Sequence, residues 1–166
     1  MAAQAERRSA LKPRAAKNKR GANFYRQALR EALKKRADLN RAKSLLEKAR
    51  SAGSAEAAYA LGNWYLHGEV FEKNPIKAVP LLKEAAQQNV PDALANLAIC
   101  YEKGIGAKKN DQRALEYYLR AALHGNNQSF YEVGRCYYYG IGTAKDRRVA
   151  RAWLDRAAEL GVPDRR

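Results

Sequence analysis

The chain has 166 residues, and 46% of them are hydrophobic, which is enough apolar material for a packed body. Its formal net charge of +15 is uneven, because residues 1–50 hold 16 of the 32 lysines and arginines but only four of the 17 acids. Two cysteines are too few for a disulfide scaffold, and no apolar run reaches the ~20 residues that cross a bilayer.

Residues 1–20 are basic and have almost no apolar content, which predicts a disordered N-terminal tail. The segment has no apolar signal-peptide core. Its Arg-rich, acid-poor composition resembles an organellar presequence, although serine is scarce. We therefore predict a cytoplasmic protein, with the organellar matrix as the alternative.

The helix-forming stretch that follows continues the basic character. Arg26, Arg30 and Lys34 recur at every fourth residue, which predicts a basic stripe on the first helix. We expect residues 1–36 to contact an anionic partner, which could be nucleic acid, an acidic protein or a membrane surface. The alternative is a solvated polar cap. The candidate anion-binding residues are Arg14, Lys17, Lys19, Arg20, Arg26, Arg30 and Lys34.

Residues 21–166 contain an internal repeat of 36 residues, which decides the fold class. One block recurs as Ala58–Gly68, Leu94–Gly104 and Phe130–Gly140. A second block with paired alanines recurs as Ala78–Ala86, Ala114–Ala122 and Ala150–Ala158. A weaker copy of the second block precedes them. The pattern predicts one repeat domain with a degenerate unit at 21–53 and clear units at 54–89, 90–125 and 126–161.

Each unit reads as two helices joined by a turn. Glycine ends the first helix, since it tolerates the left-handed cap conformation, and these positions are Gly68, Gly104 and Gly140. A residue suited to an N-cap precedes the second helix, and these positions are Asp38, Asn74, Asn110 and Asp146. We expect eight helices in four hairpins, with turns near residues 37, 72, 108 and 144. One hairpin cannot bury its apolar face alone, so the hairpins should stack.

These blocks resemble the Sel1-like repeat, a relative of the tetratricopeptide repeat. The resemblance rests on Leu61-Gly62, Tyr65 and Gly68, and on the paired glycines of Gly104-Ile105-Gly106 and Gly140-Ile141-Gly142. It implies an all-α, right-handed α-α superhelix (a solenoid) that works as a protein–protein adaptor. It also allows an immunity protein that neutralises a cognate toxin. The basic N-terminus leaves an RNA-associated or ribonucleoprotein subunit as a further alternative.

The concave face should be lined by the first helix of each unit, on the side opposite its repeated apolar positions. This side varies between units, as a surface fitted to a partner would, although a solvated face would vary too. Ile99 and Tyr139 have large apolar side chains, which are not expected at positions that face only solvent. The candidate partner-binding residues are Asn63, His67, Asn96, Ile99, Lys103, Glu132, Arg135, Tyr138 and Tyr139.

No spacing in the sequence indicates catalysis, a cofactor or a metal site. The Gly-Ile-Gly pairs end helices instead of following strands, so they read as turns and not as phosphate loops. Cys100 and Cys136 share the repeat position of Trp64, which predicts buried packing residues with free thiols. We predict a protein that is not an enzyme. Its highly charged last helix should cap the array and keep it monomeric without its partner.

Overall fold

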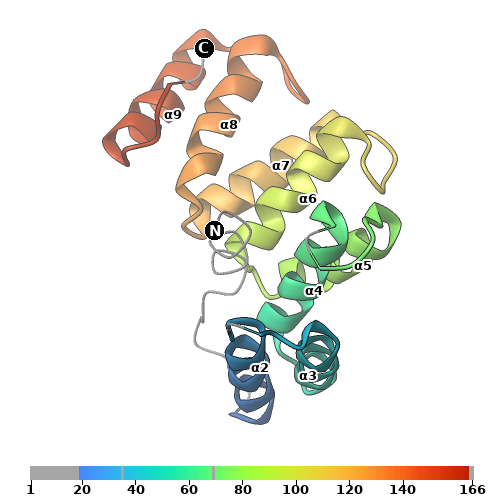
Figure 1. Cartoon of the computed structure of the whole chain (residues 1–166). Helices are drawn as coiled ribbons and strands as arrows, with labels where there is room; N and C mark the ends of the chain where they lie inside the picture. Colours follow the sequence, from blue (N-terminus) through green and yellow to red (C-terminus); the bar gives the residue numbers. More distant parts are fainter. Residues whose placement is uncertain (1–18, 35, 69, 165–166) are drawn as a thin grey trace. The chain divides into compact units, whose positions relative to one another are not determined.

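The computed structural model describes residues 19–34, 36–68 and 70–164. These residues form eight α-helices and no strand (Figure 1). The helices are α2 (Lys19–Ala32), α3 (Leu39–Ser51), α4 (Ala55–His67), α5 (Pro75–Gln87), α6 (Pro91–Lys103), α7 (Asp111–Leu123), α8 (Asn127–Tyr139) and α9 (Arg147–Glu159). The predicted all-α fold, with eight helices paired into four hairpins, is confirmed for this part of the chain.

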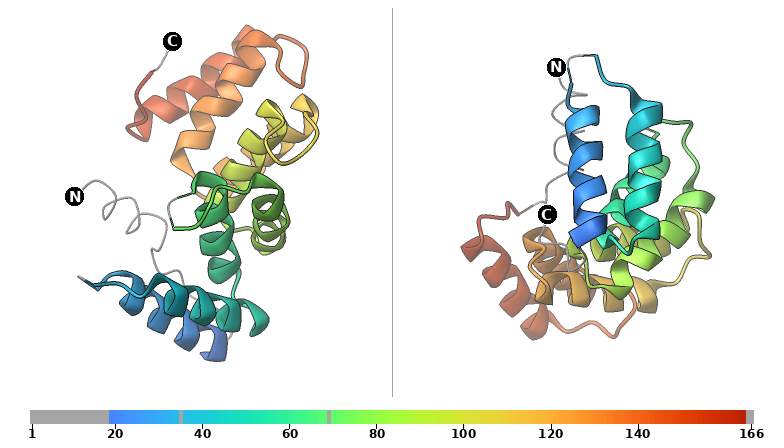
Figure 2. Two further views of the ribbon diagram at one scale, coloured as in Figure 1. Left: turned by 45° about the vertical axis from the view of Figure 1, so that its right-hand side comes forward. Right: turned by 90° about the horizontal axis from the view of Figure 1, so that it is seen from below.

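The hairpins group into two compact units that divide between Gln88 and Asn89. The first unit holds α2 to α5, in which α2 packs against α3, α3 against α4, and α4 against α5. The second unit holds α6 to α9, which pack in the same succession (Figures 1 and 2). Each unit is therefore a pair of stacked hairpins, and its two inner helices, α3 and α4 in the first unit and α7 and α8 in the second, each pack against two neighbours.

The helix ends follow the predicted caps. The side chains of Asp38, Asn74, Asn110 and Asp146 each accept a hydrogen bond from a backbone N–H in the first turn of the helix that follows. Gly68, Gly104 and Gly140 end the first helices with φ of +76°, +70° and +76°. The cap residues thus fix where each turn begins and ends.

Glycine brings the two helices of a hairpin close together. A Cβ atom on Gly134 would lie 2.6 Å from Cγ of Leu154 and 3.2 Å from the carbonyl oxygen of Ala150, both on α9. Gly62 occupies the same repeat position on α4 and faces Leu81 and Leu82 of α5 in the same way. The small residue at this position is therefore a requirement of close helix packing.

None of the helices in the described ranges is long and apolar enough to cross a membrane.

Candidate functional site

In the first unit, the predicted partner-binding side of α4 is largely covered. Asn63 is only 7% exposed and Ala60 is fully buried, because α3 packs on one side of α4 and α5 on the other. His67, in the last turn, is exposed. Of the two residues predicted on this helix, only His67 presents an open side chain.

In the second unit, the predicted residues are more open. Ile99 and Tyr139 are 36% and 52% exposed, which makes them two of the few large exposed apolar residues among those described. Lys103 is exposed, while Asn96, Glu132, Arg135 and Tyr138 are half-buried. We call these seven residues, together with Glu102, the α6–α8 surface.

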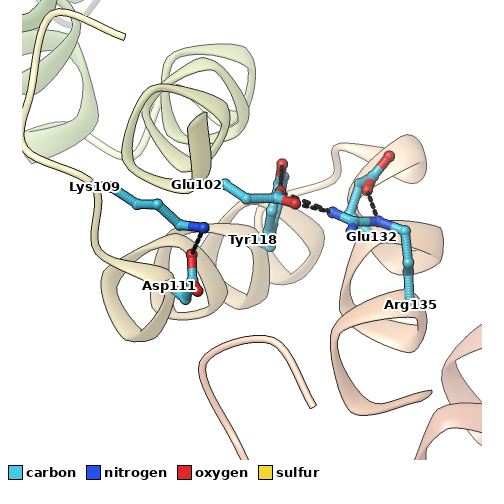
Figure 3. Close-up of polar contacts among 6 residues, drawn as sticks. All are labelled: Glu102, Lys109, Asp111, Tyr118, Glu132 and Arg135. Carbon is cyan, nitrogen blue, oxygen red and sulfur yellow. Dashed lines mark hydrogen bonds and ion pairs between the residues drawn. The ribbon is translucent and has the colours of Figure 1, made fainter. Parts of the chain in front are cut away.

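Arg135 pairs with Glu102 and Glu132 in this surface (Figure 3). Its Nη2 donates to both carboxylate oxygens of Glu102, at 2.8 and 2.7 Å, and its Nε donates to Glu132 at 2.8 Å. The hydroxyl of Tyr118, on α7, donates to Glu102 at 2.9 Å. The side chains of Arg135 and Glu102 are only 22% and 17% exposed. Three helices of the second unit are therefore joined by one partly buried polar network.

The surroundings shift the titration of two of these groups. Burial alone would lower the pKa of Arg135, but the hydrogen bonds to Glu132 and Glu102 and the negative charges of these two carboxylates together raise it. Burial, and then the charge of Glu102, raise the pKa of Tyr118. Arg135 therefore stays charged and Tyr118 stays neutral across the physiological range. Two carboxylates on one guanidinium leave the network with a formal excess of one negative charge.

Glu102 and Tyr118 were not among the residues predicted from the sequence. Glu102 occupies the repeat position of Leu66, which is 7% exposed, and Tyr118 occupies that of the fully buried Leu82. The available signal in the sequence was a charged residue at a position where the preceding repeat has a leucine. The spacing along one helix could not show it, because Arg135 comes from the next hairpin.

Aromatic side chains extend the surface toward α9. The rings of Tyr138 and Tyr139 meet edge to face at 4.9 Å, and the guanidinium of Arg147 lies 5.4 Å from the ring centre of Tyr138. A cavity of about 390 Å³ adjoins them, lined by Tyr138, Arg147, Arg151, Leu154 and Asp155.

Five of the seven predicted anion-binding residues lie on α2 or just after it. Arg14 and Lys17 are outside the described residues. Lys19 and Arg20 form the first turn of α2, so the helix begins two residues before the predicted end of the tail. Arg26 and Arg30 are exposed on the same helix. Lys34 follows the end of α2 and pairs with Glu31 at 2.7 Å, so it does not continue the helical stripe.

The two cysteines are packing residues. Cys100 and Cys136 are fully buried in α6 and α8, and burial raises the pKa of their thiols to about 11 and about 12. A thiol that stays protonated is a poor nucleophile and a poor metal ligand. Within the described ranges, no group of three or more His, Cys, Asp or Glu side chains could hold a metal ion.

The model for the Sel1 repeat family matches residues 29–54, 55–90, 91–126 and 131–162. No curated protein matches the sequence. Among solved structures, a protective antigen of uropathogenic Escherichia coli displaying an SLR fold is 29% identical, with a TM-score of 0.81 over 85% of this chain and 31% of that one. A Sel1 repeat protein from Oxalobacter formigenes is 35% identical, with a TM-score of 0.72 over 75% of this chain and 49% of that one.

This chain thus spans only 31% and 49% of the length of these two structures. An immunity protein from Pseudomonas aeruginosa is 23% identical, with a TM-score of 0.59 over 90% of this chain and 55% of that one. At that identity the likeness shows the fold alone. Sel1 repeat proteins are protein-interaction scaffolds, and they are typically not enzymes. Because the four matched segments cover most of its length, the chain belongs to the Sel1 repeat family.

Proposed function

We propose that this protein is a scaffold that binds a partner protein through the α6–α8 surface. The observation that carries the proposal is the position of Ile99 and Tyr139 beside the Arg135 network. Ile99 lies one turn before Glu102 on α6, and Tyr139 lies one turn after Arg135 on α8. Two exposed apolar side chains thus flank a charged group that is already partly removed from water.

The network gives this surface a fixed shape and a defined charge. Arg135 is held by three hydrogen bonds, so binding would cost little further ordering of its side chain. Lys103 balances this charge over the whole surface, so the excess negative charge is local to the network, where it favours a partner's arginine, lysine or N–H donor. Aromatic and aliphatic anchors around a desolvated charge are typical of the centre of a protein interface.

The proposal is tested by affinity capture with the whole chain as bait and by mass spectrometry of the bound proteins. Ile99→Asp and Tyr139→Ala should each remove the same captured protein, because each deletes one apolar anchor. Ile76→Asp is the matched control, since Ile76 is an isoleucine that is 76% exposed on α5. Capture that survives both surface variants, or that Ile76→Asp removes equally, would count against the α6–α8 surface.

A dissociation constant is then measured with the purified partner. Loss of the excess carboxylate in Glu132→Gln should weaken binding by about tenfold if the partner places a cation there. Glu116→Gln on the exposed side of α7 removes the same charge away from the network and should have little effect. Circular dichroism of each variant checks that the helices remain intact.

A further inference from the structure

We propose that the α2–α3 hairpin binds single-stranded nucleic acid. In this proposal Phe24 stacks on a base in the cavity between the two helices, and the exposed cations of α2 contact the phosphates. The site lies in the first unit and does not depend on the function proposed for the α6–α8 surface.

The cavity is large enough for a nucleotide and contains an aromatic wall. Its volume is about 820 Å³, within the usual range for small-molecule sites. It lies where α2 begins and α3 ends, because the two helices of a hairpin run in opposite directions. Phe24 packs against the apolar core of the first unit and is half-buried, so its ring is held in place. The lining residues are Arg20, Phe24, Ser44, Glu47, Lys48, Ser51 and Ala52.

The chemistry of the α3 wall suits the edge of a base better than a phosphate. Ser44 and Ser51 offer hydroxyl groups, and Glu47 offers a carboxylate. The last turn of α3 also carries the partial negative charge of a helix C-terminus. The hydroxyl groups and the second oxygen of Glu47 can accept hydrogen bonds from the amino and imino groups of a base, and Lys48, on the same wall, can contact a phosphate. Stacking on Phe24 supplies an attraction that every base shares.

Further exposed cations lie on α2, on a face of the helix that does not line the cavity. Lys19, Arg26 and Arg30 are exposed, and with Asn23 they follow a spacing of four, three and four residues, which places them on one face. This face is opposite the one that buries Tyr25. Among the described residues these three cations make no ion pair with an acid, so their charge is available to a ligand.

The acids of the hairpin are already engaged. Glu31 pairs with Lys34 at 2.7 Å, and its side chain is only 10% exposed. Asp38 caps α3 by accepting from the backbone N–H of Arg41, and Glu47 pairs with Arg50 at 3.3 Å. The positive potential of α2 is therefore not cancelled locally. An acidic protein or a lipid headgroup would use these cations but not the aromatic cavity, so the combination favours nucleic acid.

The experiment is a fluorescence-anisotropy titration of a labelled 12-nucleotide oligouridylate with the whole chain at several salt concentrations. The logarithm of affinity should fall linearly with the logarithm of salt concentration, with a slope near −0.7 for each phosphate contacted. Arg26→Gln combined with Arg30→Gln should make the slope shallower by about 1.4. Phe24→Leu should weaken binding by about tenfold or more and leave the slope unchanged, because stacking releases no counterions.

The matched controls remove the same groups elsewhere. Lys108→Gln combined with Arg148→Gln deletes two exposed cations in the second unit, and Phe71→Leu alters another half-buried phenylalanine of the first unit. Both should leave the affinity within about twofold. If Phe24→Leu loses its helical circular-dichroism signal, Lys48→Gln at the exposed rim of the cavity is tested in place of that variant. It should weaken binding and make the dependence of affinity on salt less steep.

Two results would overturn the proposal. One is the absence of salt-dependent binding to the oligouridylate. The other result has two parts. The wild-type protein binds polyaspartate of equal charge as tightly as it binds the oligonucleotide, and Phe24→Leu binds both ligands as tightly as the wild type does. That outcome would show a purely electrostatic anion site. An oligodeoxyuridylate of the same length tests the role of the 2′-hydroxyl, and binding of both strands supports recognition by stacking.

Discussion

Gly142 is the position at which a single added methyl group should do most damage. It follows the first helix of the last hairpin and has φ of +71°, the left-handed region that disfavours every residue with a Cβ atom. A Cβ atom there would overlap the backbone carbonyl of Asp111, at the start of α7. Backbone atoms cannot rotate away as a side chain can, so the loop or the helix would have to move.

The size of this effect can be separated into two parts. The left-handed conformation costs alanine about 1–2 kcal/mol. Forcing an extra carbon into a packed site costs a further ~1–3 kcal/mol. Gly142→Ala should therefore lower the free energy of unfolding by about 2–5 kcal/mol. Gly161→Ala is the matched control, because Gly161 has φ of +75° with no atom within 4 Å of an added Cβ, so it should show the first part alone.

The assay is urea unfolding followed by far-ultraviolet circular dichroism, with the free energy taken from the midpoint and slope. Both glycines lie in the second unit, so separate unfolding of the first unit would affect the two variants equally. The reasoning is refuted if the two variants lose the same free energy within about 0.5 kcal/mol.

Four further predictions concern a helix cap, the thiols, the pH dependence of stability and assembly. Asn110→Ala should cost about 1 kcal/mol of stability in the same urea assay, because it leaves the N–H of Arg113 without its cap, and an unchanged midpoint would contradict this. Ellman titration without reductant should find two thiols in the unfolded chain and none in the folded one, since Cys100 and Cys136 are buried and unpaired with each other; fewer than two would indicate a disulfide. Burial raises both thiol pKa values from 9.0 to about 11 and 12, so the folded state holds its thiol protons more tightly than the unfolded state does. The free energy of unfolding should therefore keep its full thiol contribution below pH ~8.5 and should fall as pH rises from 9 to 12. The fall should be less steep when Cys100 and Cys136 are both replaced by alanine. Light scattering should give the mass of a monomer at low micromolar concentration and high salt, and a dimer mass would contradict the self-capping hypothesis.

The sequence was sufficient to predict the helices, their caps and their pairing. The reason is that these features depend on local chemistry repeated at a fixed offset. An aspartate or asparagine before each second helix, and a glycine after each clear first helix, need only their own neighbours to act. Repetition turned several weak local signals into one strong one. The same comparison correctly predicted that Cys100 and Cys136 would be buried, as Trp64 is.

The details of the candidate surface could not be predicted in this way, because they depend on contacts between hairpins. Asn63 is on the predicted side of α4, yet the neighbouring helices bury it. Glu102 was overlooked because its partner Arg135 lies 33 residues away on another helix. Helical spacing gives the direction of a side chain relative to its own helix only. What covers that side chain is decided by the packing of the next element.

The second unit contains the polar network of Arg135, whereas the matching repeat positions of the 54–89 repeat are mostly apolar. By repeat position alone, the 54–89 repeat has Ala60, Asn63, Leu66 and Leu82 where the network has Glu132, Arg135, Glu102 and Tyr118, and all four are buried in a single hairpin, whereas the network joins two hairpins. Replacing a whole buried ion-pair network by packed apolar groups is often neutral or stabilising by ~1–4 kcal/mol, whereas removing one partner is destabilising. Stability alone therefore does not account for Arg135 and its two carboxylates, whereas the binding role proposed for the α6–α8 surface would.

The last prediction concerns a variant in which the network residues of the second unit are replaced by the residues of the 54–89 repeat. The fourfold variant carries Glu102→Leu, Tyr118→Leu, Glu132→Ala and Arg135→Asn. It should unfold at a urea midpoint equal to or above that of the wild type, yet lose the partner captured through Ile99 and Tyr139. Arg135→Asn alone should unfold earlier, because it leaves two half-buried carboxylates without their cation. If the fourfold variant is instead less stable than the single one, the network holds the hairpins together, and its presence needs no partner to explain it.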